Sequence, residues 1–118
     1  MRVIILAGVL FFVPLLARAE VTVGEYRNKA NDPELQQTFH DYVLGVGKGI
    51  FWANSRLIAE HRQPLFCQPE NLGLDQAVIL DLLSQELRKP SVGGSYKDDT
   101  PIEAILVRSF MYRFPCQK

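Results

Sequence analysis

The chain has 118 residues, 47% of them hydrophobic, and its 13 basic side chains balance 13 acidic ones. This length suits one domain with a modest hydrophobic core. The even charge argues against a nucleic-acid partner, which calls for a clustered basic surface, and no run of Lys and Arg favours an anionic membrane. We therefore expect the partner to be another protein, with neither nucleic acid nor membrane bound by the mature chain.

The first residues are typical of a secretory signal peptide. Arg2 gives a positive start, residues 3–16 form an almost unbroken apolar run, and residues 17–19 (Ala-Arg-Ala) match a cleavage site. An uncleaved membrane anchor is the alternative, but a bilayer-spanning helix needs about 20 apolar residues and this run is shorter. We predict that residues 1–19 are a cleaved signal peptide and that residues 20–118 form a single, soluble helical domain.

Cys67 and Cys116 are the only cysteines in the chain. Export would leave them one possible intramolecular disulfide bond, whereas two free buried thiols would fit a protein that stays in the cytosol. Closing a loop of about 50 residues would stabilise the fold by roughly 4 kcal/mol in the chain-entropy model. That is a large part of the total for a small domain, on the order of 5–10 kcal/mol.

The first half of the expected domain is dominated by one helix. Residues 20–31 predict an irregular or partly helical lead-in, and Asp32-Pro33-Glu34 then combines an N-cap carboxylate, a first-turn proline and a first-turn acid. Apolar residues follow at spacings of three and four, which predicts an amphipathic helix ending near His61. These residues are Leu35, Phe39, Tyr42, Val43, Val46, Ile50, Ala53, Leu57 and Ile58.

Three glycines interrupt this helix, at a cost of about 1 kcal/mol each against alanine. Gly45 and Gly49 lie one turn apart on one face, so we expect them to let another helix or an aromatic side chain pack closely. A kink at the glycines is the alternative. The pattern does not decide whether this face belongs to the core or to a dimer.

Two shorter helices complete the expected fold. The first spans about residues 74–89 with an apolar stripe of Ala77, Leu80, Leu83 and Leu87, widened by Val78, Ile79 and Leu82. The second begins with a capping box at residues 100–103 and ends near Phe114, with a buried stripe of Ile102, Ile105, Leu106, Ser109 and Phe110. No strand pattern appears, so the fold class is all-α: a compact bundle of three to four helices with one disulfide.

Little in the sequence suggests catalysis. Residues 45–49 lack the glycine spacing and the Ser/Thr of a phosphate-binding loop. His40 and His61 are too isolated to predict a metal site, and a bridge would consume both possible nucleophilic thiols. We expect a protein that is not an enzyme and that holds neither metal nor cofactor.

Two features are candidates for partner binding. The loop of residues 91–99 presents Tyr96, Lys97, Asp98 and Asp99 beside two glycines, and a protruding loop on a rigid scaffold suits an inhibitor. A solvated connector is the alternative. Most aromatic residues are expected in the core, but Trp52 and Tyr112 are examples of side chains that could instead lie exposed at an interface.

Three segments together resemble the Tai/Rap family of periplasmic immunity proteins, which neutralise peptidoglycan amidases delivered by type VI secretion. They are Tyr42-Val43-Leu44-Gly45-Val46, Phe66-Cys67-Gln68-Pro69 and Phe114-Pro115-Cys116, and Gly-Ile-Phe-Trp-Ala-Asn at residues 49–54 is similar to one branch. The resemblance covers about residues 26–117. Many relatives carry further cysteines before the Tyr-x-x-Gly motif, and this chain has none there.

The resemblance implies an all-α periplasmic inhibitor, often a homodimer. We therefore expect an immunity-type protein that binds and inhibits a secreted peptidoglycan amidase. The alternative is a small periplasmic stress or scaffold protein that binds envelope proteins without inhibiting an enzyme.

Overall fold

A computed structural model describes residues 20–117, so the expected signal peptide at residues 1–19 lies outside the described residues. Four helices follow one another: α1 (Val23–Lys29), α2 (Gln36–Ala59), α3 (Gln76–Arg88) and α4 (Ile102–Arg113). Within residues 20–117 there is no strand, only an isolated bridge that pairs Thr22 with Pro101. The predicted all-α class is confirmed.

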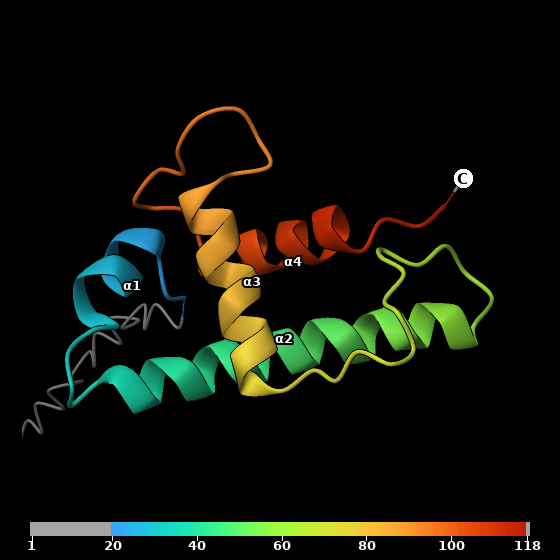
Figure 1. Cartoon of the computed structure of the whole chain (residues 1–118), viewed down its shortest axis with the longest axis horizontal. Coiled ribbons are helices and arrows are strands. Elements are labelled where there is room, and N and C mark those ends of the chain that lie inside the picture. Colours follow the sequence, from blue (N-terminus) through green and yellow to red (C-terminus); the bar gives the residue numbers. More distant parts are fainter. Residues whose placement is uncertain (1–19, 118) are drawn as a thin grey trace, which may run out of the picture.

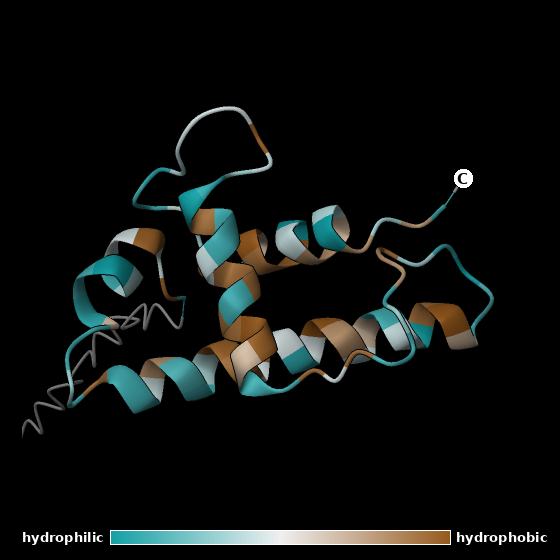
Figure 2. Cartoon of the chain, in the orientation of Figure 1, coloured by the Kyte–Doolittle hydropathy of each residue, from teal (hydrophilic) through white to brown (hydrophobic). Residues whose placement is uncertain are grey.

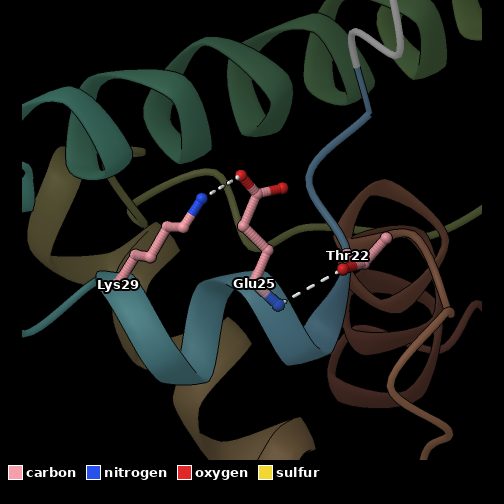
Figure 3. A network of polar contacts seen from close by, with 3 residues as sticks. All are labelled: Thr22, Glu25 and Lys29. Atoms are coloured by element: carbon pink, nitrogen blue, oxygen red, sulfur yellow. Dashed lines mark hydrogen bonds and ion pairs between the residues drawn. The ribbon is translucent and has the colours of Figure 1, made fainter.

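The short helix α1 is held by its cap and by the start of α4. The Thr22 hydroxyl accepts a hydrogen bond from the Glu25 backbone N–H at 3.2 Å, and the Lys29 ammonium donates to the Glu25 carboxylate at 3.2 Å (Figure 3). Val23 is fully buried, and its backbone N–H donates to the Thr100 carbonyl at 2.9 Å. A helix of seven residues is marginal by itself, so these tertiary contacts determine where it forms.

The long helix α2 begins one turn later than its sequence signal. The Asp32 carboxylate accepts from the Glu34 N–H at 3.0 Å, and the Asp32 carbonyl accepts from Leu35 and Gln36. Asp32 therefore caps a turn that precedes the helix, rather than the helix itself. The other end agrees better with expectation, because His61 adopts a left-handed φ of 55° and leads the chain out of α2.

The three longer helices meet around one core. In Figure 1, α3 stands upright and crosses α2, and α4 starts beside α3 and runs in roughly the same direction as α2. Helix α3 contacts both α2 and α4. Hydrophobic residues gather where α3 meets its neighbours, whereas most of α1 is hydrophilic (Figure 2). The main cluster of fully buried side chains comprises Val23, Val43, Ile79, Leu83, Ile102, Ile105 and Leu106.

The buried face was predicted correctly for α4 but only in part for α3. All five residues of the predicted α4 stripe are buried, so that prediction is confirmed. The buried residues of α3 are Ile79, Leu82, Leu83 and Glu86, of which the three apolar ones belong to the predicted stripe and its widening and Glu86 does not. Ala77, which belongs to the predicted stripe, is exposed. Apolar residues extend around so much of α3 that the densest apolar stripe does not identify the side that packs.

Close packing at Gly45 and Gly49 is not found within the described chain, and packing of this face against a second copy stays a prediction. Nothing lies within 4 Å of where a Cβ on Gly45 or Gly49 would be. The close approach is at Gly47, where a Cβ would come within 2.6 Å of the Ile79 Cγ2 on α3. Residues two positions apart on a helix point about 200° apart, so alternate glycines cannot share the packed face.

The start of α4 also departs from its predicted capping box. Its N-cap residue, Pro101, makes no side-chain capping bond. The first backbone N–H, from Ile102, donates to the Val21 carbonyl at 3.0 Å, and the Glu103 carboxylate accepts from the Tyr42 hydroxyl of α2. The Glu103 carboxylate, which a capping box would bond to the Thr100 N–H, thus bonds Tyr42, and the Thr100 N–H donates to the Lys97 carbonyl at 3.1 Å.

The disulfide between Cys67 and Cys116 forms as predicted, with the two Cα atoms 4.8 Å apart. Beside it the rings of Phe66 and Phe110 stack with centroids 4.8 Å apart, and the Cys67 N–H donates to the Phe114 carbonyl at 2.8 Å. The bridge therefore joins the loop before α3 to the segment after α4, next to a second cluster of buried side chains made by Phe66, Leu82 and Phe110.

Candidate interaction surface

The loop of residues 91–99 does not present its four candidate residues as one exposed patch. Lys97, Asp98 and Asp99 are exposed, but Tyr96 turns inward and packs against the main core. The Asp98 carbonyl accepts from the Gly24 N–H at 3.0 Å, and its carboxylate lies 3.9 Å from the Arg27 guanidinium. Tyr96 is thus a residue that holds the loop, and its contact with a partner, like that of Lys97, Asp98 and Asp99, stays a prediction.

Tyr96 holds the loop through Glu86, a fully buried carboxylate on α3. One oxygen, Oε1, accepts from the Ser91 N–H at 2.9 Å, the Ser91 hydroxyl at 2.7 Å and the Tyr96 hydroxyl at 2.6 Å. Burial alone would raise the pKa of the Glu86 carboxyl, but these bonds, with Arg108 nearby, bring it below its usual value. The ionised carboxylate therefore fixes both the start and the middle of the loop.

Sequence reasoning missed Glu86, because a charged residue near a helix end is usually solvated. The available signal was its spacing of three and four residues from Leu83 and Leu82, which places it on the buried face once that face is known. Tyr96 then supplies a donor for a carboxylate that has no basic partner within ion-pair distance in the described residues.

Two of the candidate aromatic side chains lie on the surface. Trp52 on α2 is 68% exposed and Tyr112 on α4 is 61% exposed. Among the aromatic rings of residues 20–117, Trp52 makes one T-shaped contact, with Phe51 at 5.4 Å between centroids. Large aromatic side chains dominate binding energy at interfaces, so their exposure fits the prediction of contact residues, and contact itself stays a prediction.

The outer face of α4 borders a hollow of about 400 Å³, here called the α4 hollow. A smaller hollow of about 230 Å³ shares Ser91 and Tyr112 with it. The α4 hollow is lined by Ser91, Ala104, Val107, Arg108, Met111 and Tyr112. The smaller hollow is lined by Lys89, Pro90, Ser91, Tyr112 and Arg113.

The two histidines lie at opposite ends of α2. His40 borders a polar hollow of about 420 Å³ with Ser84 of α3, and exposed His61 follows the last turn of the helix. Among residues 20–117, no three His, Cys, Asp or Glu side chains gather to hold a metal ion. In the same residues no helix has the length and hydropathy needed to cross a membrane.

Comparison with known proteins adds no relative. No protein-family model, curated protein or solved structure matches the chain.

Proposed function

We propose that the chain is an exported, immunity-type inhibitor that binds a peptidoglycan amidase of type VI secretion in the periplasm and covers its active-site cleft. The proposal starts from the resemblance of three segments to the Tai/Rap family: Tyr42 to Val46, Phe66 to Pro69, and Phe114 to Cys116. Two of these segments meet at the disulfide and one contributes to the α2 core. The three segments thus have related structural roles in one scaffold.

The observation that carries the proposal is a cross-linked scaffold with large apolar side chains on its outside. Trp52, Met111 and Tyr112 are all at least 45% exposed, while the backbone beneath them belongs to packed helices. A rigid surface loses little conformational entropy on binding, so more of its contact energy appears as affinity. A stable disulfide also fits an oxidising compartment such as the periplasm.

The test is a contact-dependent competition between bacteria. A strain that lacks the gene is grown against its own parent, with the secretion apparatus of the parent either working or inactivated. We expect the deletion strain to lyse only beside the armed parent, and a plasmid copy of the gene to restore survival. Equal survival in both pairings, under conditions where the apparatus fires, would contradict the immunity function.

A second candidate is a periplasmic stress or scaffold protein that binds envelope proteins without inhibiting an enzyme. It is favoured by the placement of the exposed aromatic residues on two separate helices, α2 and α4, which suits two simultaneous contacts. One of these could be a second copy of this chain, as a homodimer. An adjacent gene for a small secreted Cys/His hydrolase would favour immunity over this alternative.

A further inference from the structure

We propose that the α4 hollow and the smaller hollow beside it form a binding site for an acidic segment of a protein partner. The segment would insert an apolar side chain against α4 and place its carboxylates beside Lys89, Arg108 and Arg113. This assignment goes beyond the proposed function, because it names a site and the chemistry of its occupant without assuming that the partner is an amidase.

The apolar part of the site comes from α4. Ala104, Val107 and Met111 follow one another at spacings of three and four, so they line one side of the helix. Phe110 is fully buried, but the next two residues, Met111 and Tyr112, are 45% and 61% exposed. The helix thus has apolar surface on two sides, and on the side away from the core Ala104 and Met111 are exposed and Val107 is half-buried.

The basic part of the site surrounds this surface. Arg108 lines the α4 hollow, Lys89 and Arg113 line its neighbour, and no Asp or Glu lines either one. None of these three cations forms an ion pair within the described part of the chain, although Arg108 lies near the buried Glu86 carboxylate and contributes to its lowered pKa. By contrast, Arg56 and Lys29 on other helices each pair with a glutamate of their own helix. The charge of the site therefore calls for an acidic occupant.

The wall opposite α4 is fixed before any partner arrives. Ser91 lines both hollows, and its N–H and hydroxyl both donate to the buried Glu86 carboxylate, at 2.9 and 2.7 Å. Glu86 is a buried residue of α3, and its carboxylate also accepts a hydrogen bond from the Tyr96 hydroxyl. A site whose wall is already ordered binds at a lower entropic cost than a loop that must first become ordered.

A protein segment fits these features better than an anionic membrane does. Membrane-binding helices present a continuous, convex apolar face with many basic residues along it. Here the apolar surface is hollowed and holds only three cations within its two linings. A hollow of about 400 Å³ suits the side chain of an extended segment and the backbone around it.

The test is a nuclear magnetic resonance titration of the ¹⁵N-labelled mature protein with two synthetic peptides. One peptide carries a central phenylalanine flanked by Asp and Glu, and the other carries the same phenylalanine flanked by Lys and Arg. We expect the acidic peptide to shift the amides of Ser91 and of residues 104–113 and to approach saturation. The basic peptide should leave these amides unchanged at the same concentrations.

Charge-reversal variants test the cations directly. Arg108→Glu should weaken the acidic peptide about fivefold, the size of one exposed ion pair. Arg62→Glu makes the same charge change at an exposed site outside both hollows, and should leave the affinity unchanged. If Arg108→Glu disturbs the fold, Tyr112→Ala provides a second test, because loss of its apolar contact should also weaken binding of the acidic peptide. Thermal melts of each variant show whether folding is retained.

Several outcomes would overturn the assignment. These are equal shifts with both peptides, shifts that map outside the two hollows, or an Arg62→Glu effect as large as that of Arg108→Glu. A final arm replaces the peptides with vesicles containing phosphatidylglycerol. If vesicles perturb residues 104–113 and the acidic peptide does not, the surface binds membrane and the proposal is wrong.

Discussion

The two long loops of this molecule are held by different chemistry. The first, residues 60–75, is fastened by the Cys67–Cys116 bond and by buried Asn54, whose amide donates to the Phe66 carbonyl and accepts from the Leu65 N–H. The second, residues 89–101, is held at Ser91 and Tyr96 by one buried carboxylate, Glu86, and at Asp98 by the Gly24 N–H. The first depends on a covalent bond and its redox state, and the second depends on protonation and hydrogen bonding.

Loss of the Cys67–Cys116 disulfide should have the largest effect on stability. Cys116→Ser is expected to lower the free energy of unfolding by about 4 kcal/mol, because the 49-residue separation no longer limits the unfolded chain. Urea unfolding under oxidising conditions measures the loss. A reductant should cause a similar loss in the wild-type protein and none in the variant. Equal stability of the two oxidised proteins would show that the bond does not stabilise the fold.

Loss of the hydrogen bonds to Glu86 should lower stability by a smaller amount. Glu86→Ala is expected to lower the free energy of unfolding by about 2–3 kcal/mol, because it leaves the Ser91 and Tyr96 donors without their acceptor. Hydrogen exchange of the Ser91 amide should accelerate, while exchange in the first loop stays unchanged. Glu70→Ala removes an exposed carboxylate from the first loop as a control. If both variants behaved alike, Glu86 would not be the fastening group.

The crossing of α2 and α3 connects the regions that hold the two loops, so a change there should weaken both. Gly47→Ala forces a Cβ to within 2.6 Å of the Ile79 side chain and is expected to cost about 1–2 kcal/mol. Gly45→Ala and Gly49→Ala place the same methyl group in open positions, and each should stabilise the helix by about 0.5–1 kcal/mol. Thermal melts of the three variants measure the contrast. Equal effects at all three positions would contradict the packing at Gly47.

The smallest expected effect is a loss of stability at alkaline pH. Burial, with the carboxylates of Glu86 and Glu103 beside them, raises the pKa of Tyr96 and of Tyr42 to about 12. The folded chain therefore keeps these phenolic protons more tightly than the unfolded chain does. Stability should be complete below about pH 10, the ordinary tyrosine pKa, and fall as the pH rises towards 12.

Ultraviolet absorbance of tyrosinate, followed during a pH titration, checks this expectation. Tyr96→Phe keeps the ring and removes the phenol, so it should abolish the part of the pH dependence that belongs to the second loop. An unchanged profile in this variant would show that Tyr96 does not contribute. The first loop has no tyrosine and should not respond.

The contrast between the loops also explains how far the sequence could predict the molecule. Cys67 and Cys116 have one possible partner each, so the expectation of export was enough to predict their bond without knowledge of geometry. The buried face of α4 follows from the spacing of three and four residues between Ile102, Ile105, Leu106, Ser109 and Phe110. Helix existence and the disulfide were therefore predictable.

Contacts that depend on helix rotation were not predictable in the same way. On α3 the apolar residues extend over more than one face, so the predicted stripe joined the buried Ile79 and Leu83 to the exposed Ala77, and Glu86 was not assigned to the packed side. The same uncertainty of rotation led to Gly45 and Gly49 instead of Gly47. The α4 hollow needs the loop, α3 and α4 together, since Ser91 and Tyr112 are distant in sequence and neighbours only after folding.

The position of Cys116 after α4 determines which parts of the folded molecule open together. Helix ends tend to fray, and the segment that follows α4 is joined covalently to the loop before α3. The end of α4 therefore cannot unwind far without moving that loop and the buried Phe66 ring that stacks on Phe110. The bond makes two segments that are distant in sequence into one unit of local unfolding.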